Sequence, residues 1–309
     1  MPDDRGALAS LGRNSRQANS RRVRGEDMND ASQTDKPKFE GLVQRVRSAL
    51  ILLPFVIAPV VYGGWPFTVL LAVAGFFMAR EWGGLLKATG TQGRMLSYLT
   101  VLLLLYGQFA GAPEAIAMCL VLALAALAIF AMRGVRATTV AGGLIYVALP
   151  LLVAQYFRLD PLGMGVIGYV LLSVWAVDIF AMFAGKLIGG PKLAPVISPN
   201  KTWAGMFGAV LGALIGAVLT FLTIVGFGFG AADFIALVVI APLLAVTAQV
   251  SDLFESAIKR KYDIKDSGAL IPGHGGLLDR VDGLIGVLLV LWIVTLVRGG
   301  DVSTALWVW

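Results

Sequence analysis

Apolar stretches of helical length dominate the chain from residue 48 onward, with short polar segments between them. A helix that crosses a bilayer needs about 20 mostly apolar residues. Because backbone polar groups inside a bilayer must bond to one another, such stretches form helices. We therefore predict an all-α fold, a polytopic bundle of about nine membrane helices. The expected segments are 48–63, 66–80, 96–111, 114–132, 139–157, 163–185, 204–226, 231–251 and 282–298, and the short first two could instead form one re-entrant hairpin.

The N-terminal segment differs from the rest of the chain in composition. Residues 1–44 are polar and of mixed charge, which predicts a disordered cytoplasmic tail. A secretory signal would carry its apolar stretch closer to the N-terminus, so the first apolar run is better interpreted as the first membrane helix. Residues 45–309 are then expected to form a single membrane-embedded domain.

Composition supports a membrane protein and narrows its chemistry. The 309 residues are 58% hydrophobic and 14% charged, with a mean hydropathy of +0.81. Soluble domains carry about 25% charged residues. The single cysteine, Cys119, and the single histidine, His274, exclude an intrachain disulfide, a Cys-based zinc site and a two-histidine metal site. In so apolar a chain, the net charge of +6 favours membrane topology and anionic lipid over nucleic acid as its explanation.

The basic residues alternate between the predicted connections. Lysine and arginine concentrate in cytoplasmic loops of membrane proteins. Here they gather before the first segment, between the second and third, and after the fourth, sixth and eighth, whereas the other connections hold only Arg158 and Arg298. The pattern predicts nine spans with the N-terminus and the polar loops facing the cytoplasm and the C-terminus on the outer side. We expect a multi-pass protein of the inner (plasma) membrane.

One polar loop, 186–203, follows the sixth segment. Glycine and proline punctuate it, which favours turns over a helix. Its lysines suit anionic groups, and the candidate substrate-binding residues in it are Lys186, Ser198, Pro199, Lys201 and Thr202. The alternative is that these lysines serve only membrane topology. Asp178, within the preceding segment, joins the candidates because a carboxylate inside a membrane helix is usually functional or paired. Its alternatives are a structural hydrogen bond or the coupling site of a transporter.

A second polar loop, 249–283, is denser in charge. If its first part is helical, Asp252, Glu255, Ser256 and Lys259 lie on one face. Glycines and further acids and bases follow, ending at Asp279 in the first turn of the last segment. Carboxylate oxygens suit Mg²⁺, lysine and arginine neutralise phosphate oxygens, and glycine lets backbone N–H groups approach an anion. The mixture indicates phosphate chemistry.

The residues from Ser256 to Asp282 resemble the C-terminal signature of the phosphatidate cytidylyltransferase family, also called CDP-diglyceride synthetases. That signature has the form S-x-x-K-R-x(4)-K-D-x-G-x(3)-P-G-H-G-G-x-x-D-R-x-D and matches here without a gap. The segment Ser198–Trp203 is similar to the family's S-P-x-K-T segment. Ser251 is one small departure, at a position where the family leads us to expect glycine.

The resemblance implies transfer of CMP from CTP to phosphatidic acid, giving CDP-diacylglycerol and pyrophosphate, by a bilayer-embedded homodimer. It implies Mg²⁺, alone or with a second cation, on Asp252, Asp279 and Asp282. Ser256, Gly275 and Gly276 join the substrate-binding candidates. The expected catalytic residues are Asp252, Lys259, Arg260, Lys265, Asp266, His274, Asp279, Arg280 and Asp282. For His274, a hydrogen bond within its loop is an alternative role. A transporter using Asp178 remains the alternative function.

Overall fold

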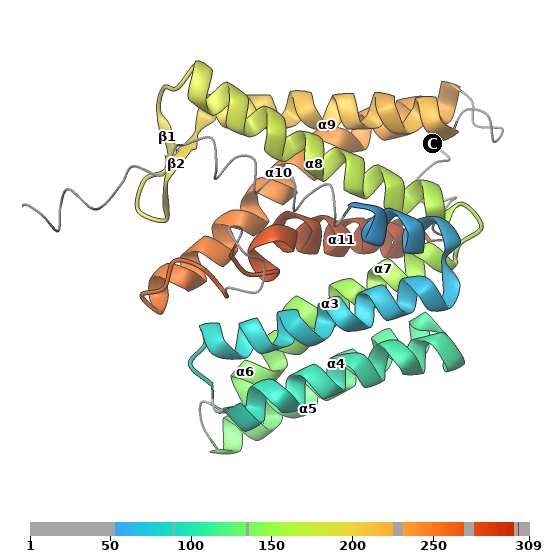
Figure 1. Cartoon of the computed structure of the whole chain (residues 1–309), viewed down its shortest axis with the longest axis vertical. Helices are drawn as coiled ribbons and strands as arrows, with labels where there is room; N and C mark the ends of the chain where they lie inside the picture. Colours follow the sequence, from blue (N-terminus) through green and yellow to red (C-terminus); the bar gives the residue numbers. More distant parts are fainter. Residues whose placement is uncertain are drawn as a thin grey trace, which may run out of the picture. The chain divides into compact units, whose positions relative to one another are not determined.

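The structure, a computed structural model, describes residues 53–88, 90–133, 136–224, 231–268, 275–299 and 302. The predicted N-terminal tail and His274 lie outside these ranges. The described chain is mainly helical, as predicted (Figure 1). After a short helix, Leu53–Tyr62, come α3 (Gly64–Leu85), α4 (Gly90–Ala110), α5 (Ala112–Arg133), α6 (Arg136–Gly143), the π-helix η1 (Leu144–Ala148), α7 (Leu149–Leu159), α8 (Gly163–Leu187), β1 (Lys192–Ala194), β2 (Ser198–Thr202), α9 (Trp203–Ile224), α10 (Ala231–Lys261) and α11 (Leu278–Arg298).

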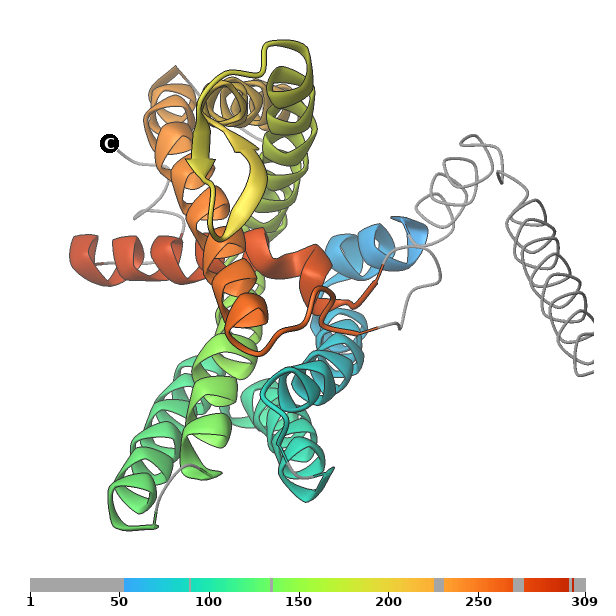
Figure 2. The same cartoon turned by 90° about the vertical axis from the view of Figure 1, so that its left-hand side faces the viewer.

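The helices of residues 53–299 form two groups on either side of α7 and α11. On one side α8 packs against α9 and α9 against α10, and on the other α3 packs against α4 and α4 against α5 (Figures 1 and 2). The span formed by α6, η1 and α7 is 83% buried inside the protein, against 28% for α5. Its apolar residues, among them Leu152 and Phe157, are therefore the centre of the core.

Helices α8 and α9 lie unusually close because glycine lines the contact. A Cβ on Gly208, Gly212 or Gly216 would lie 2.5–2.6 Å from atoms of α8, including the carbonyl oxygen of Ala176. Without a hydrophobic drive between helices in lipid, such small residues permit the close packing that holds membrane helices together. This contact fixes α8, which carries Asp178, against the helix that follows the polar hairpin.

The structure bears on the predicted number of membrane helices and on the all-α prediction. Among the described residues, seven helices are long and apolar enough to cross a membrane; Leu53–Tyr62 is shorter, and α4 is less apolar, so the count of nine stays a prediction. The all-α prediction misses one feature, the antiparallel hairpin of β1 and β2, in which Lys192 pairs with Thr202 and Ala194 with Ser198. Prolines at 191, 195 and 199 disfavour helix there, and the strands satisfy each other's backbone groups.

Candidate functional site

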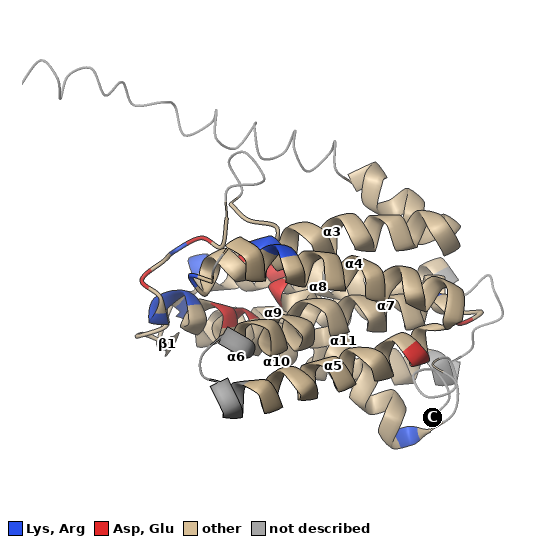
Figure 3. Cartoon of the chain, turned by 90° about the horizontal axis from the view of Figure 1, so that it is seen from below, with Lys and Arg blue, Asp and Glu red and all other residues tan. Residues whose placement is uncertain are grey.

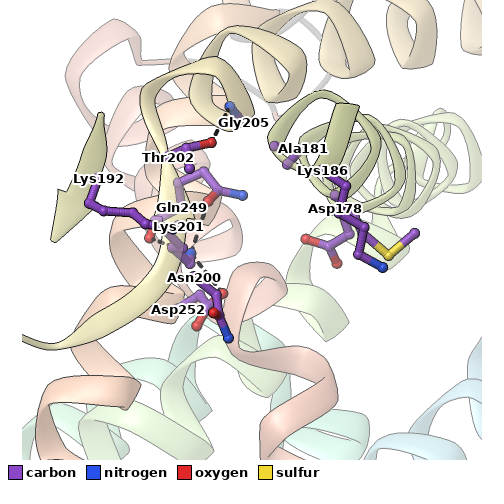
Figure 4. A pocket seen from close by; sticks show the side chains of 12 residues that line it. Asp178, Ala181, Lys186, Lys192, Asn200, Lys201, Thr202, Gly205, Gln249 and Asp252 are labelled. Atoms are coloured by element: carbon purple, nitrogen blue, oxygen red, sulfur yellow. Dashed lines mark hydrogen bonds and ion pairs between the residues drawn. The ribbon is translucent and has the colours of Figure 1, made fainter. Parts of the chain in front are cut away.

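A cavity of about 570 Å³ opens where the hairpin meets the bundle (Figure 4). Helix α8 forms one wall, and β2, the start of α9 and the middle of α10 form the others. Most of its polar lining comes from the two predicted loops, which the fold brings together although about 50 residues separate them. The lining residues are Asp178, Ala181, Met182, Gly185, Lys186, Lys192, Asn200, Lys201, Thr202, Gly205, Gln249 and Asp252.

Lys201 and Asp252 form the centre of one wall. The Lys201 Nζ lies 2.7 Å from Asp252 Oδ2 and donates to Gln249 Oε1 at 2.9 Å and to the Gln249 carbonyl at 3.3 Å. The lysine side chain is only 15% exposed. A lysine that served topology alone would extend into solvent, so this geometry favours the prediction that Lys201 acts in a site.

The opposite wall belongs to α8. Asp178 and Lys186 face Lys201, Asn200 and Asp252 across the cavity (Figure 4). Asp178 interacts electrostatically with Asp252, Lys201 and Arg280. Its carboxylate is therefore part of a charged cavity, which favours a functional role for Asp178 over a purely structural one.

A second polar network lies beside the cavity, where α10 ends and α11 begins. Asp279 Oδ1 accepts from Lys259 Nζ at 2.8 Å, and its Oδ2 accepts from the backbone N–H groups of Ser267 (2.9 Å) and Gly276 (3.0 Å). Lys259 also lies 3.2 Å from Oε1 of the fully buried Glu255. Both Asp279 oxygens are thus engaged, and the carboxylate fastens two segments of the chain together.

Asp282 lies within electrostatic range of both this network and the cavity. It interacts electrostatically with Asp252, Glu255 and Asp178, and Gly283 N–H donates to its Oδ1 at 2.8 Å. The Ser251 hydroxyl donates to the Asp282 carbonyl at 2.5 Å. This hydrogen bond satisfies the hydroxyl of Ser251. Gly286 leaves room for the serine side chain, since a Cβ on Gly286 would lie 2.6 Å from Ser251 Cβ.

The donor set fits a divalent cation in part. Asp178, Asp252 and Asp282 place like charges within electrostatic range, and such a group favours a cation among them. Within the described ranges, no three His, Cys, Asp or Glu side chains form a ready-made metal site. Mg²⁺ commonly takes one or two carboxylates and completes its shell with water and phosphate oxygens, so Asp252 and Asp282 fit it. Asp279 fits less well because its oxygens already accept hydrogen bonds.

The remaining predicted residues hold the site in shape or lie at its rim. Thr202 Oγ1 accepts from Gly205 N–H at 3.1 Å, next to the start of α9, and Ser256 Oγ donates to Asp252 Oδ1 at 3.3 Å. Arg260 Nε donates to the Ile197 carbonyl at 3.4 Å, which tethers the hairpin to α10. Ser198 and Pro199 are part of β2, and Lys265 and Asp266 lie in an exposed turn after α10. Gly275 has φ +84°, which favours glycine.

Four contributors are not among the predicted site residues. Lys192, Asn200 and Gln249 line the cavity, and Gln249 could have been found because it precedes Asp252 by three residues on one helical face. Glu81 could not have been found from the sequence, because it lies in α3 and binds the N-terminus of α11, almost 200 residues later.

The described residues form a helical bundle with seven helices of membrane-spanning length and a cavity lined by lysines and carboxylates, so the fold is that of a polytopic membrane protein. The sequence profile of the cytidylyltransferase family matches residues 43–297, and the chain belongs to that family. Similar proteins are the phosphatidate cytidylyltransferases of Rickettsia bellii (46% identical over 147 residues), Brucella abortus (42% over 154) and Rickettsia conorii (41% over 155). These matches cover 46–50% of this chain and 55–66% of the relatives' own lengths.

Proposed function

We propose that this protein is a phosphatidate cytidylyltransferase, which transfers CMP from CTP to phosphatidic acid. The observation that carries the proposal is the cavity in which Lys201, Lys186 and Lys192 surround space next to Asp252, in a chain of the cytidylyltransferase family. The names of the relatives support the same substrates. A transporter coupled through Asp178 fits less well, because the charged residues gather at one end of the bundle (Figure 3).

The chemistry asks for positioning and charge neutralisation. A phosphate oxygen of phosphatidic acid attacks the α-phosphorus of CTP, a P–O bond forms, and the bond to the β-phosphate breaks so that pyrophosphate leaves with the electron pair. The nucleophile is already anionic, so no strong base is needed, and phosphoryl-type transfer relies mainly on orientation and electrostatics. Lys201, held at 2.7 Å from Asp252, offers a fixed positive charge to the phosphates.

Mg²⁺, when bound, would neutralise phosphate charge and orient the triphosphate. Asp252 and Asp282 would hold it, and Asp178 would add negative charge across the cavity. Arg280, which interacts electrostatically with Asp178, would offset part of the negative charge on that side of the cavity. Lys259 and Asp279 would fix the start of α11 and therefore Asp282, three residues further along it.

The setting in the cell belongs to the same proposal. The site would face the cytoplasm of an inner (plasma) membrane, where CTP is present, and phosphatidic acid would enter sideways from the bilayer. A homodimer remains part of the proposal through the family resemblance.

A direct assay tests the function. Purified protein in lipid nanodiscs containing phosphatidic acid receives Mg²⁺ and CTP labelled at the α-phosphate. We expect label in a lipid of the mass of CDP-diacylglycerol, with equimolar pyrophosphate, and no lipid label without phosphatidic acid. Label released only as free CMP would show a hydrolase instead, and CTP left intact by protein that is folded would overturn the proposal.

A further inference from the structure

The start of α11 is held by a residue of α3, a helix that does not line the cavity. Glu81, in α3, accepts from the backbone N–H groups of Leu277 at 2.9 Å and Leu278 at 2.8 Å, one with each carboxylate oxygen. These are the first free N–H groups of α11, which begins at Leu278. The N-terminus of a helix attracts anions, so a carboxylate binds it well.

Glu81 also reaches the other end of the same loop. Ser267 Oγ donates to Glu81 Oε2 at 3.3 Å, and Ser267 N–H donates to Asp279. Two carboxylates, Glu81 and Asp279, thus each bind both the segment before residue 269 and the segment after 274. Together they fix the separation of those two segments and the direction in which α11 starts.

Two signature glycines are explained by this contact. A Cβ on Gly268 would lie 2.7 Å from Glu81 Oε1, and its three nearest atoms would all belong to Glu81. A Cβ on Gly276 would lie closest to Ser267 Oγ, which itself donates to Glu81, and 2.8 Å from Glu81 Oε2. The sequence predicted that glycine here admits an anion. That prediction concerned an anionic ligand and stays a prediction; the group that the structure places beside both glycines is the protein's own Glu81.

We propose that Glu81 is a positioning residue for the reaction, which acts by holding α11 so that Asp279 and Asp282 keep their places beside the cavity. The inference rests on the proposed function for its effect on turnover, and on the contacts alone for its effect on the loop. Outer-shell groups that orient functional carboxylates commonly matter by about 10–100-fold in activity.

The first test compares Glu81→Ala and Glu81→Gln with Glu114→Gln, an exposed glutamate at the start of α5. We expect Glu81→Ala to lower kcat about 10–100-fold. The glutamine variant should lie between alanine and wild type, because its amide oxygen keeps one acceptor. The KM for CTP should change by less than about threefold, because the cavity walls lie on α8, β2 and α10. Full turnover in Glu81→Ala would overturn the proposal.

The second test needs no activity. Gly268→Ala should displace the Glu81 side chain and lower stability in the wild-type background. The same substitution should lower stability little in a Glu81→Ala background, because the obstructing side chain is gone. Gly84→Ala, with open space around it, is the control. Thermal stability and the rate of tryptic cleavage after the exposed Lys265 report the effect. If Gly268→Ala lowered thermal stability equally in both backgrounds, the contact between residue 268 and Glu81 would be contradicted. If wild type made no CDP-diacylglycerol, the proposed function would fail, and this cycle would still decide the role of Glu81.

Discussion

Asp279 and Asp252 are both acidic residues next to the site, yet their surroundings differ in a way that separates their roles. Asp279 is 11% exposed and accepts bonds from Lys259 and two backbone N–H groups. Asp252 is 36% exposed and is paired with Lys201 at the cavity wall. A carboxylate that already binds three donors stabilises the fold, whereas one at a cavity wall can accept a new ligand.

Asp252→Asn should therefore impair catalysis and leave the fold intact. The substitution keeps size but removes the charge that would bind Mg²⁺ and hold Lys201. We expect turnover to fall by about 100-fold or more, the scale of losing a major electrostatic group. A Mg²⁺ titration of wild type and variant checks it, with melting temperature measured in parallel. Near-normal turnover at the same Mg²⁺ demand would show that Asp252 is not a metal ligand.

Asp279→Asn should impair both stability and catalysis. An amide can accept on one side only, so at least one bond to Lys259, Ser267 or Gly276 is lost in a poorly exposed place. Leaving such donors unsatisfied costs about 1–3 kcal/mol each. The measurement is a thermal melt in detergent alongside turnover. A variant with unchanged melting temperature and an altered Mg²⁺ demand would instead make Asp279 a direct ligand.

Lys201 gives a test of charge against shape. Lys201→Met keeps much of the apolar stem but removes the cation that lies among Gln249, Asp252 and the cavity. We expect the KM for CTP to rise and kcat to fall, since the phosphates lose a fixed positive charge while Asp252 and Asp178 repel them. Arg260→Met, which removes a hairpin tether outside the cavity lining, is the comparison. Equal, mild effects of both would mean that Lys201 serves topology.

Among the helices, the packing of α8 on α9 decides the width of the cavity. Gly212 is the clearest position, because a Cβ there would meet the backbone carbonyl of Ala176 at 2.5 Å. Gly212→Ala should cost about 1–3 kcal/mol as an overpacking change and weaken CTP binding by displacing α8. Gly168→Ala, also within this helix pair but with nothing within 4 Å, should be neutral or slightly stabilising. Thermal melts and CTP titrations of both variants check this, and equal melting temperatures would contradict it.

Helix boundaries show where hydropathy alone stops being informative. The segment predicted at 231–251 ends where apolar residues end, but α10 continues to Lys261. The helical spacing of Asp252, Glu255, Ser256 and Lys259 predicted that extension conditionally, and the structure confirms it. The hairpin was not predictable by period, because three- and five-residue strands rich in proline and lysine carry no alternation.

The site itself was partly predictable. The signature residues and the S-P-x-K-T segment mark both polar loops, and the structure brings Lys201 and Asp252 into contact. That Asp252 lines the cavity whereas Asp279 and Asp282 do not could not be inferred, because it depends on contacts between helices. Glu81 carries no local signal, since its role comes from tertiary contacts with Ser267, Leu277 and Leu278.

Across the membrane domain, charge is distributed unevenly between the two ends. Lysine and arginine gather at the end with β1, whereas the opposite end holds few charged residues (Figure 3). The site end includes Lys186, Lys192, Lys201, Lys259, Arg260 and Lys261. Cytoplasmic ends of membrane proteins carry this excess, so we predict that the site end faces the cytoplasm.

Labelling of single cysteines can test that orientation because Cys119 is the only cysteine and is buried. In a Cys119→Ala background, Lys261→Cys reports the site end and Glu114→Cys the opposite end, both at exposed positions. Helix α3 runs from the Glu114 end to the site end and α4 returns, so the two reporters lie on opposite sides if the helices cross the bilayer.

We expect a membrane-impermeant maleimide to label Glu114→Cys in cells with a permeabilised outer envelope, and Lys261→Cys only after the inner membrane is opened. Activity of both variants confirms that the fold is kept. Labelling of Lys261→Cys in sealed cells would place the cavity outside, away from CTP, and would contradict both the topology and the proposed function.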